Sequence, residues 1–263
     1  MPILPGAEPF THDGSTDVGV LLCHGFTGSP QSMAPWGARL AEAGWTVRCP
    51  LLPGHGTRWQ DMNRTGWPDW YRAVDDAFAE LSERCTTVFV FGLSMGGTLA
   101  LRLAELHGAD VAGLVLVNPS VTTERKDAAL LPLLAKIVPS MPGISNDVKK
   151  PGATELAYRR LPLRAAAGLS KLWQEVRGDL GRVEQPLLLF RSAVDHVVEP
   201  VNARIILDGV PATDVQEVVL PDSYHVATLD NDAPTIFDGS VEFVRRICQQ
   251  RAGQPVAQPR EGT

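Results

Sequence analysis

The sequence lacks a long apolar segment. None of its hydrophobic runs approaches the roughly 20 residues that a helix needs to cross a bilayer. Its first residues, MPILPGAEPF, have neither the positive start nor the long apolar middle of a secretory signal. We therefore expect a protein without a membrane span, located in the cytoplasm.

Paired cysteines and clusters of basic residues are also missing. The four cysteines, Cys23, Cys49, Cys85 and Cys248, form no C-x-x-C pair, so we expect reduced thiols and no metal site. The net charge is −6 and no basic stripe stands out, which argues against nucleic acid as a partner. The hydrophobic content of 44% is ordinary for a protein with a packed core.

Apolar strands alternate with amphipathic helices along much of the chain. Val18–Gly25, Thr86–Gly92 and Val111–Ser120 are nearly continuous apolar runs, which is typical of parallel strands that are buried on both faces. Asp69–Arg84, between two of these runs, has apolar residues at helical spacing. The alternation predicts an α/β protein with a mostly parallel central sheet and helices on both faces.

The alternation stops between residues 121 and 182, where helix-like apolar pieces and prolines replace the strands. It resumes at Pro186. We interpret residues 1–120 and 183–250 as one core, and residues 121–182 as a small helical cap inserted between two of its strands. Residues 251–263 are predicted to form a disordered tail.

The strongest chemical signal is Gly92-Leu93-Ser94-Met95-Gly96, between a buried strand and a helix. This context is that of a nucleophile elbow, where a sharp turn exposes a serine hydroxyl above the sheet edge. Side chains at Gly92 and Gly96 would collide with the adjoining strand and helix. The helix N-terminus would favour negative charge at this place. Ser94 is therefore the predicted nucleophile.

A serine hydroxyl needs a base to take its proton. The order expected after a nucleophile elbow is serine, acid, histidine. His225 follows the last predicted strand, and Asp195 follows the strand before it, so we predict His225 as the base and Asp195 as the acid that orients its ring. Asp222 and Asp230 are reserve candidates for the acid, and His196 is interpreted as a loop residue near the triad.

The loop His24–Gly28, HGFTG, follows the first clear strand. It matches the loop that supplies one backbone amide to an oxyanion hole. We predict the N–H groups of Phe26 and Met95 as the two donors, and a structural role for the His24 ring in holding the loop.

Seven stretches closely resemble the bacterial monoacylglycerol lipases and their carboxylesterase relatives, members of the α/β-hydrolase superfamily. In chain order they are GAEPF, GVLLCHGFTGSPQSM, PLLPGHGT, GLSMGGTLAL, ELAYRRLP, DHVVEP and SYHVATLDND. The resemblance implies an α/β-hydrolase fold with a small helical cap, and hydrolysis of monoacylglycerols or short- to medium-chain esters without any cofactor. It carries the nucleophile, acid, base and oxyanion donors onto the residues predicted above.

The resemblance also implies that Glu155 faces the glycerol hydroxyls and that Ile144 lines the same pocket. The alternative for Glu155 is a solvated carboxylate. The sequence departs from the family mostly within Val121–Gly143, so the acyl-chain preference does not carry over. The apolar cap residues would shelter the alkyl chain, contact lipid peripherally or only pack on the core. The oligomeric state is left open.

The sequence is also compatible with two other functions. One is a thioesterase, amidase or other hydrolase on the same fold, because a fold does not fix a substrate. The other is a non-catalytic ligand-binding protein, which Ser94, His225 and Asp195 together disfavour.

Overall fold

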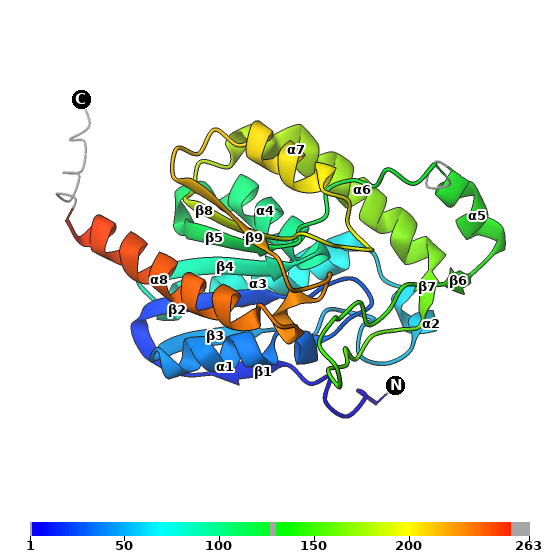
Figure 1. Cartoon of the computed structure of the whole chain (residues 1–263), viewed down its shortest axis with the longest axis horizontal. Coiled ribbons are helices and arrows are strands. Elements are labelled where there is room, and N and C mark those ends of the chain that lie inside the picture. The colour runs from blue at the N-terminus through cyan, green and yellow to red at the C-terminus, as the bar shows by residue number, and fades with distance from the viewer. Residues whose placement is uncertain (1, 127–129, 254–263) are drawn as a thin grey trace.

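The strands form one main sheet. The computed structural model describes residues 2–126 and 130–253. Within these residues, seven strands pair in the order β1-β3-β2-β4-β5-β8-β9, and each neighbouring pair is parallel except β1 with β3 (Figure 1). Their bounds are β1 Phe10–His12, β2 Ser15–Cys23, β3 Trp45–Cys49, β4 Thr87–Leu93, β5 Val111–Val117, β8 Leu187–Ser192 and β9 Val215–Leu220. The predicted mostly parallel sheet is confirmed.

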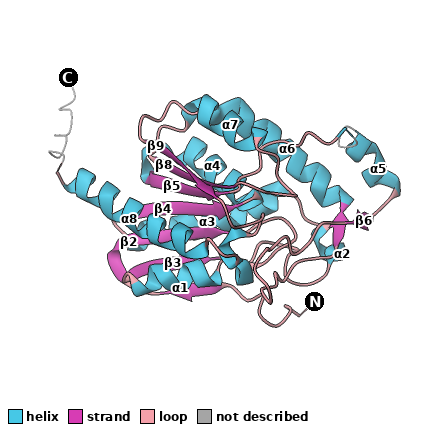
Figure 2. Ribbon diagram, viewed as in Figure 1, coloured by secondary structure: helices cyan, strands magenta, loops and turns pink. Residues whose placement is uncertain are grey.

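Helices cover both faces of this sheet, as Figure 2 shows. Residues of α1 and α8 pack in one buried cluster, and residues of α3, α4, α6 and α7 pack in the other. The helices are α1 Ala34–Glu42, α2 Trp59–Met62, α3 Trp67–Arg84, α4 Met95–His107, α5 Leu131–Ile137, α6 Leu163–Asp179, α7 Val201–Gly209 and α8 Ala233–Ala252. 3₁₀ turns are found in the described residues at Pro30–Ser32, Gly108–Asp110, Leu180–Arg182 and Ala227–Leu229.

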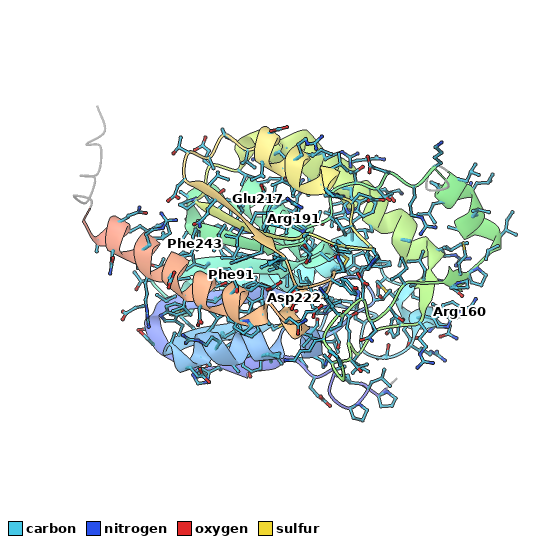
Figure 3. The ribbon with its side chains drawn as sticks, viewed as in Figure 1. Phe91, Arg160, Arg191, Glu217, Asp222 and Phe243 are labelled. Atoms are coloured by element: carbon cyan, nitrogen blue, oxygen red, sulfur yellow. The ribbon has the colours of Figure 1, made fainter. Side chains whose placement is uncertain are left out.

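The central strands are apolar throughout because both of their faces are covered. In β4, Val88 and Val90 belong to the cluster with α3 and α4, whereas Phe89 and Phe91 belong to the cluster with α1 and α8. Successive side chains of a strand point to opposite faces, so an uninterrupted apolar run is needed here. Phe91, labelled in Figure 3, stacks on Trp36 with the ring centroids 5.2 Å apart.

The parallel arrangement brings the carboxyl ends of five strands to one edge of the sheet. His24 follows β2, Ser94 follows β4, and Asn118 follows β5. Asp195 lies beyond the end of β8, and His225 lies beyond the end of β9. This is the edge at which open α/β sheets bind ligands.

The segment between β5 and β8 differs from a purely helical insertion. It contains two short antiparallel strands, β6 (Ser140–Pro142) and β7 (Arg160–Pro162). They were not predicted, because three residues are too few to show a strand pattern. Helix α6 also lies within residues 121–182, yet its buried side chains join the core beside α3 and α4. The division into a core and a cap remains a prediction.

Three further expectations concern the C-terminal residues, the cysteines and membrane-spanning helices. Helix α8 continues to Ala252, and residues 254–263 of the predicted tail lie outside the described residues. All four cysteines are free thiols. No helix in the described part of the chain is both long enough and apolar enough to span a bilayer.

Candidate active site

Ser94 lies at a sharp turn between β4 and α4. Its backbone has φ 55° and ψ −119°, a conformation that costs a non-glycine residue of order 1–3 kcal/mol and persists only when its surroundings impose it. The Ser94 N–H donates to the carbonyl of Val117 at 2.9 Å, and the Ser94 carbonyl accepts the N–H of Gly97 at 2.9 Å. These bonds fix the turn that the sequence predicts as a nucleophile elbow.

Two glycines allow this turn because side chains would not fit. A Cβ on Gly96 would overlap the carbonyl of Cys23 at the end of β2. A Cβ on Gly92 would overlap the carbonyl of Gly96 in the first turn of α4. The expected collisions with strand and helix are therefore present, and they explain why the motif needs glycine at both places.

Asp195 and His225 form a buried pair. His225 Nδ1 lies 2.8 Å from Asp195 Oδ2, and their side chains are 9% and 5% exposed. Asp195 Oδ1 accepts the backbone N–H groups of Val197 and Val198, both at 2.8 Å. With its second oxygen held in this way, the carboxylate presents Oδ2 to the imidazole and selects the tautomer with the proton on Nδ1.

The charges of this pair shift both pKa values. Burial opposes ionisation of Asp195, but the charge and hydrogen bond of His225 and two backbone N–H groups outweigh it and lower the pKa of Asp195. Burial likewise opposes protonation of His225. The charge and hydrogen bond of Asp195, with the charges of Glu155 and Asp147, outweigh burial and raise the pKa of His225 above its usual value.

Asn118 connects the end of β5 to the loop that carries His225. Its Nδ2 donates to the His225 carbonyl at 2.8 Å and to Ser192 Oγ at 3.0 Å. Its neighbour Val117 accepts the Ser94 N–H, so one strand end holds the backbone of both Ser94 and His225. Sequence reasoning missed Asn118; its place directly after a buried strand is the signal that could have identified it.

The loop after β2 lies against the nucleophile turn. A Cβ on Gly25 would be 3.6 Å from the Cβ of Ser94, an ordinary contact distance. The His24 ring is buried; its Nδ1 lies 3.0 Å from the Gly25 carbonyl, and its Nε2 accepts the N–H of Leu52 at 3.1 Å. The ring therefore ties the loop in place, as predicted.

The two predicted amide donors come from different elements: Phe26 lies in the loop after β2, and Met95 begins α4. The Phe26 ring makes edge contacts with His55 and Trp70, with centroids 6.4 and 5.8 Å apart. Met95 is the first residue of α4 and is buried. Backbone N–H groups in the first turn of a helix have no partner within the helix, so they remain available to an anion.

The two reserve candidates for the acid, and the loop residue His196, have other partners. Asp222, labelled in Figure 3, lies 2.6 Å from Lys149 Nζ, and its side chain is half-exposed. Asp230 is buried and accepts four backbone N–H bonds, including that of Tyr224 at 2.9 Å. His196 is half-exposed, and its Nδ1 lies 2.8 Å from Asp147 Oδ1. Only Asp195, of these carboxylates, meets the His225 ring.

The two predicted pocket residues differ in their positions. Glu155 is partly buried, and a Cβ on Gly28 would lie 2.8 Å from its Oε1, so its carboxylate lies against the loop His24–Gly28. Burial raises the pKa of Glu155, although the charge of His225 lowers it. Ile144 is half-exposed and belongs to neither buried core cluster. The structure thus brings Glu155 close to the predicted triad and leaves Ile144 at the surface.

Comparison with known proteins finds a matching family and similar relatives. A family model described as serine aminopeptidase, S33, matches residues 14–232. A thermostable monoacylglycerol lipase from Bacillus sp. strain H-257 is 45% identical over 92% of this chain and 96% of its own length. A carboxylesterase from Bacillus subtilis strain 168 is 28% identical over 91% of this chain and 97% of its own.

A solved structure is similar over nearly the whole fold. It comes from work on the metagenome-derived lipolytic enzymes LipS and LipT, and it superimposes with a TM-score of 0.90 at 40% identity. The match covers 93% of this chain and 100% of the other. The resemblance to bacterial monoacylglycerol lipases and the α/β-hydrolase fold predicted from the sequence are both confirmed.

Proposed function

We propose that this chain, which belongs to the serine aminopeptidase S33 family, is a carboxylic ester hydrolase that uses Ser94, His225 and Asp195. The observation that carries this proposal is the buried Asp195–His225 pair at the same sheet edge as the strained Ser94 turn. The names of similar relatives, monoacylglycerol lipase and carboxylesterase, favour esters over peptides. The substrate we propose is a monoacylglycerol or a short- to medium-chain acyl ester.

In the proposed mechanism, the Ser94 oxygen attacks the ester carbonyl carbon while His225 Nε2 takes the hydroxyl proton. The carbonyl oxygen becomes negative and receives hydrogen bonds from the N–H groups of Phe26 and Met95. His225 then gives its proton to the departing alcohol, which leaves an acyl-enzyme on Ser94. Water attacks this acyl group with His225 again as base, and the carboxylic acid is released.

Asp195 supports each proton transfer. It holds the ring of His225 with Nε2 free to accept a proton, and its negative charge stabilises the imidazolium that forms in the transition state. No redox chemistry and no metal-bound nucleophile enter these steps.

The apolar segment around α5 is the proposed shelter for the acyl chain. Leu130, Leu133 and Ile137 are all exposed, Ile137 by 78%, and Figure 1 shows α5 standing away from the sheet. We propose that residues of this cap cover the alkyl chain and meet the lipid surface from which it is drawn. Exposed apolar patches on proteins commonly mark such contacts.

Initial rates on a substrate panel test the proposed function. The panel contains 1-monoacylglycerols of graded chain length, the matching methyl and p-nitrophenyl esters, thioesters and aminoacyl amides. We expect hydrolysis of the oxygen esters, with a further rise where long monoacylglycerols exceed their solubility and form aggregates. Faster turnover of amides or thioesters than of all the oxygen esters would reject the ester assignment.

The acidic limb of the pH profile of kcat/KM should reflect the titration of His225. The base must be neutral to accept a proton, and its surroundings raise its pKa above that of an ordinary histidine, about 6.5. Activity should therefore already decline as the pH falls through neutrality, and kcat/KM measured from pH 5 to 9 checks this. A flat profile down to about pH 5 would count against His225 as the base.

Glu155 is proposed to bind the glycerol hydroxyls of a monoacylglycerol. Glu155→Gln should raise KM for a monoacylglycerol about tenfold and change KM for the matching p-nitrophenyl ester little, because hydrogen bonds to a charged group contribute about 1.5–3 kcal/mol. Glu175→Gln, an exposed change on α6, is the matched control. Equal effects of Glu155→Gln on both substrates would remove the glycerol contact from the proposal.

A further inference from the structure

Asp147 contacts both of the loops that carry the predicted acid and base. It lies between β6 and β7, with its side chain 11% exposed. Its Oδ2 accepts the backbone N–H of His225 at 3.1 Å and that of His196 at 3.3 Å. Its Oδ1 lies 2.8 Å from His196 Nδ1, and its backbone carbonyl accepts the N–H of Val226 at 3.0 Å. One residue thus holds the neighbour of Asp195 and the backbone of His225.

The same segment is also fastened to the loop after β2 and to the 3₁₀ turn that follows it. Gln31 accepts the N–H of Leu156 at 2.9 Å and donates to the carbonyl of Thr154 at 3.0 Å. The N–H of Tyr158 donates to the carbonyl of Thr27 at 3.1 Å. The segment that carries Asp147 therefore contacts the loop of Asp195, the loop of His225 and the loop after β2. A displacement of Asp147 would shift the backbone of His225.

We propose that Asp147 is a positioning residue for His225, with a second effect through its charge. Its Oδ2 and its backbone carbonyl fix the main chain at His225 and Val226, from which the imidazole extends to meet Asp195. Its negative charge, close to the His225 backbone, favours the imidazolium that forms during the reaction. This role rests on the proposed function of His225 as the base.

The charge effect is separable from the mechanical effect because three carboxylates act on His225. They are Asp195 from the loop after β8, and Glu155 and Asp147 from the segment between β6 and β7. Burial of the ring lowers the pKa of His225, but the three negative charges together outweigh burial and raise it. Removal of one of these charges should lower that pKa, whereas a loss of position alone should leave it where it is.

Asp147→Asn is the main test. The amide removes the charge. Its oxygen, in the place of Oδ2, can still accept the backbone N–H groups of His225 and His196, but its NH₂ then faces His196 Nδ1 and ends any contact that depends on an acceptor there. We expect kcat for a p-nitrophenyl ester at pH 8 to fall about tenfold or more with KM changed little. We also expect the acidic limb of kcat/KM to move to lower pH. Asp222→Asn removes an exposed carboxylate from the His225 loop and should leave both quantities as they are in the original protein.

Asp147→Glu separates the two effects and serves if the asparagine variant does not fold. The longer side chain keeps the charge but displaces the acceptor oxygens, so we expect kcat to fall while the acidic limb stays near its original pH. An acidic limb and kcat that Asp147→Asn leaves unchanged would overturn the proposal. A fall in kcat in both variants with no movement of the limb in either would overturn the charge effect.

A titration of the His225 ring by NMR does not depend on turnover. Its pKa should be lower in Asp147→Asn than in the original protein, and lower than in Asp222→Asn. If the pKa of His225 falls in Asp147→Asn but neither the original protein nor the variants hydrolyse esters, the proposed function fails and the role of Asp147 stands. If esters are hydrolysed, and both kcat and the His225 titration are the same in all three proteins, the role of Asp147 fails and the proposed function stands.

Discussion

Ser94→Ala should abolish ester hydrolysis and leave the fold intact. Removal of the nucleophile of a serine–histidine–aspartate triad costs on the order of 10⁴–10⁶ in kcat, because no other group forms the acyl-enzyme. Alanine keeps the Cβ that Ser94 already accommodates at its positive φ, so the turn gains little strain. Initial rates on a p-nitrophenyl ester and a monoacylglycerol, with far-UV circular dichroism and a thermal melt, check both parts.

Ser120→Ala is a suitable control for this change. Ser120 is buried, and its N–H donates to the Ser94 carbonyl at 3.3 Å. Its hydroxyl accepts the N–H of the Trp173 ring at 3.2 Å. This variant should keep most of the activity. Turnover of either ester by Ser94→Ala within about tenfold of the original rate would refute the nucleophile.

Asp195→Asn should reduce kcat by about 10⁴-fold with little loss of stability. The reason lies in the two N–H groups of Val197 and Val198 that point at Oδ1. An asparagine must turn its oxygen to these donors, which aims its NH₂ group at His225 Nδ1. The imidazole then carries its proton on Nε2, facing Ser94, and is no longer a base.

The control for Asp195→Asn is Asp222→Asn, the exposed reserve candidate that pairs with Lys149. We expect its kcat to match that of the original protein. Initial rates at pH 8 distinguish the two aspartates directly. A larger loss in Asp222→Asn than in Asp195→Asn would exchange their assigned roles, and the hydrogen-bond geometry argues against that result.

The parts of the fold that follow from local pattern were predictable. Continuous apolar runs such as β4 and β5 identify strands that are buried on both faces, and the Ser94 motif is informative because it joins such a strand to a helix. Parallel strands then bring their carboxyl ends to one edge. The positions of Ser94, Asp195 and His225 after parallel strands were therefore enough to predict that they share one edge of the sheet.

The contacts that tie the loops together were not predictable. Asp147 and Asp230 are polar residues in loops, and nothing in the local sequence distinguishes their buried hydrogen bonds from solvated ones. Asn118 directly follows a buried strand, which marks its position but not its partners. Their partners lie about 75 or more positions away in several cases, as for Asn118 with His225 and Asp147 with His225. The core position of α6 was also missed, because an amphipathic helix has the same pattern on a core as in a cap.

Mapping of a fluorophosphonate adduct tests the central claim most directly. The probe reacts with a serine only when a nearby base activates its hydroxyl. We predict a single adduct on Ser94 in the original protein, formed faster as the pH rises through the titration of His225, and almost no adduct in His225→Ala. An adduct on a different serine, or equally fast labelling of Ser94 after His225→Ala, would contradict the assignment of His225 as the base that activates Ser94.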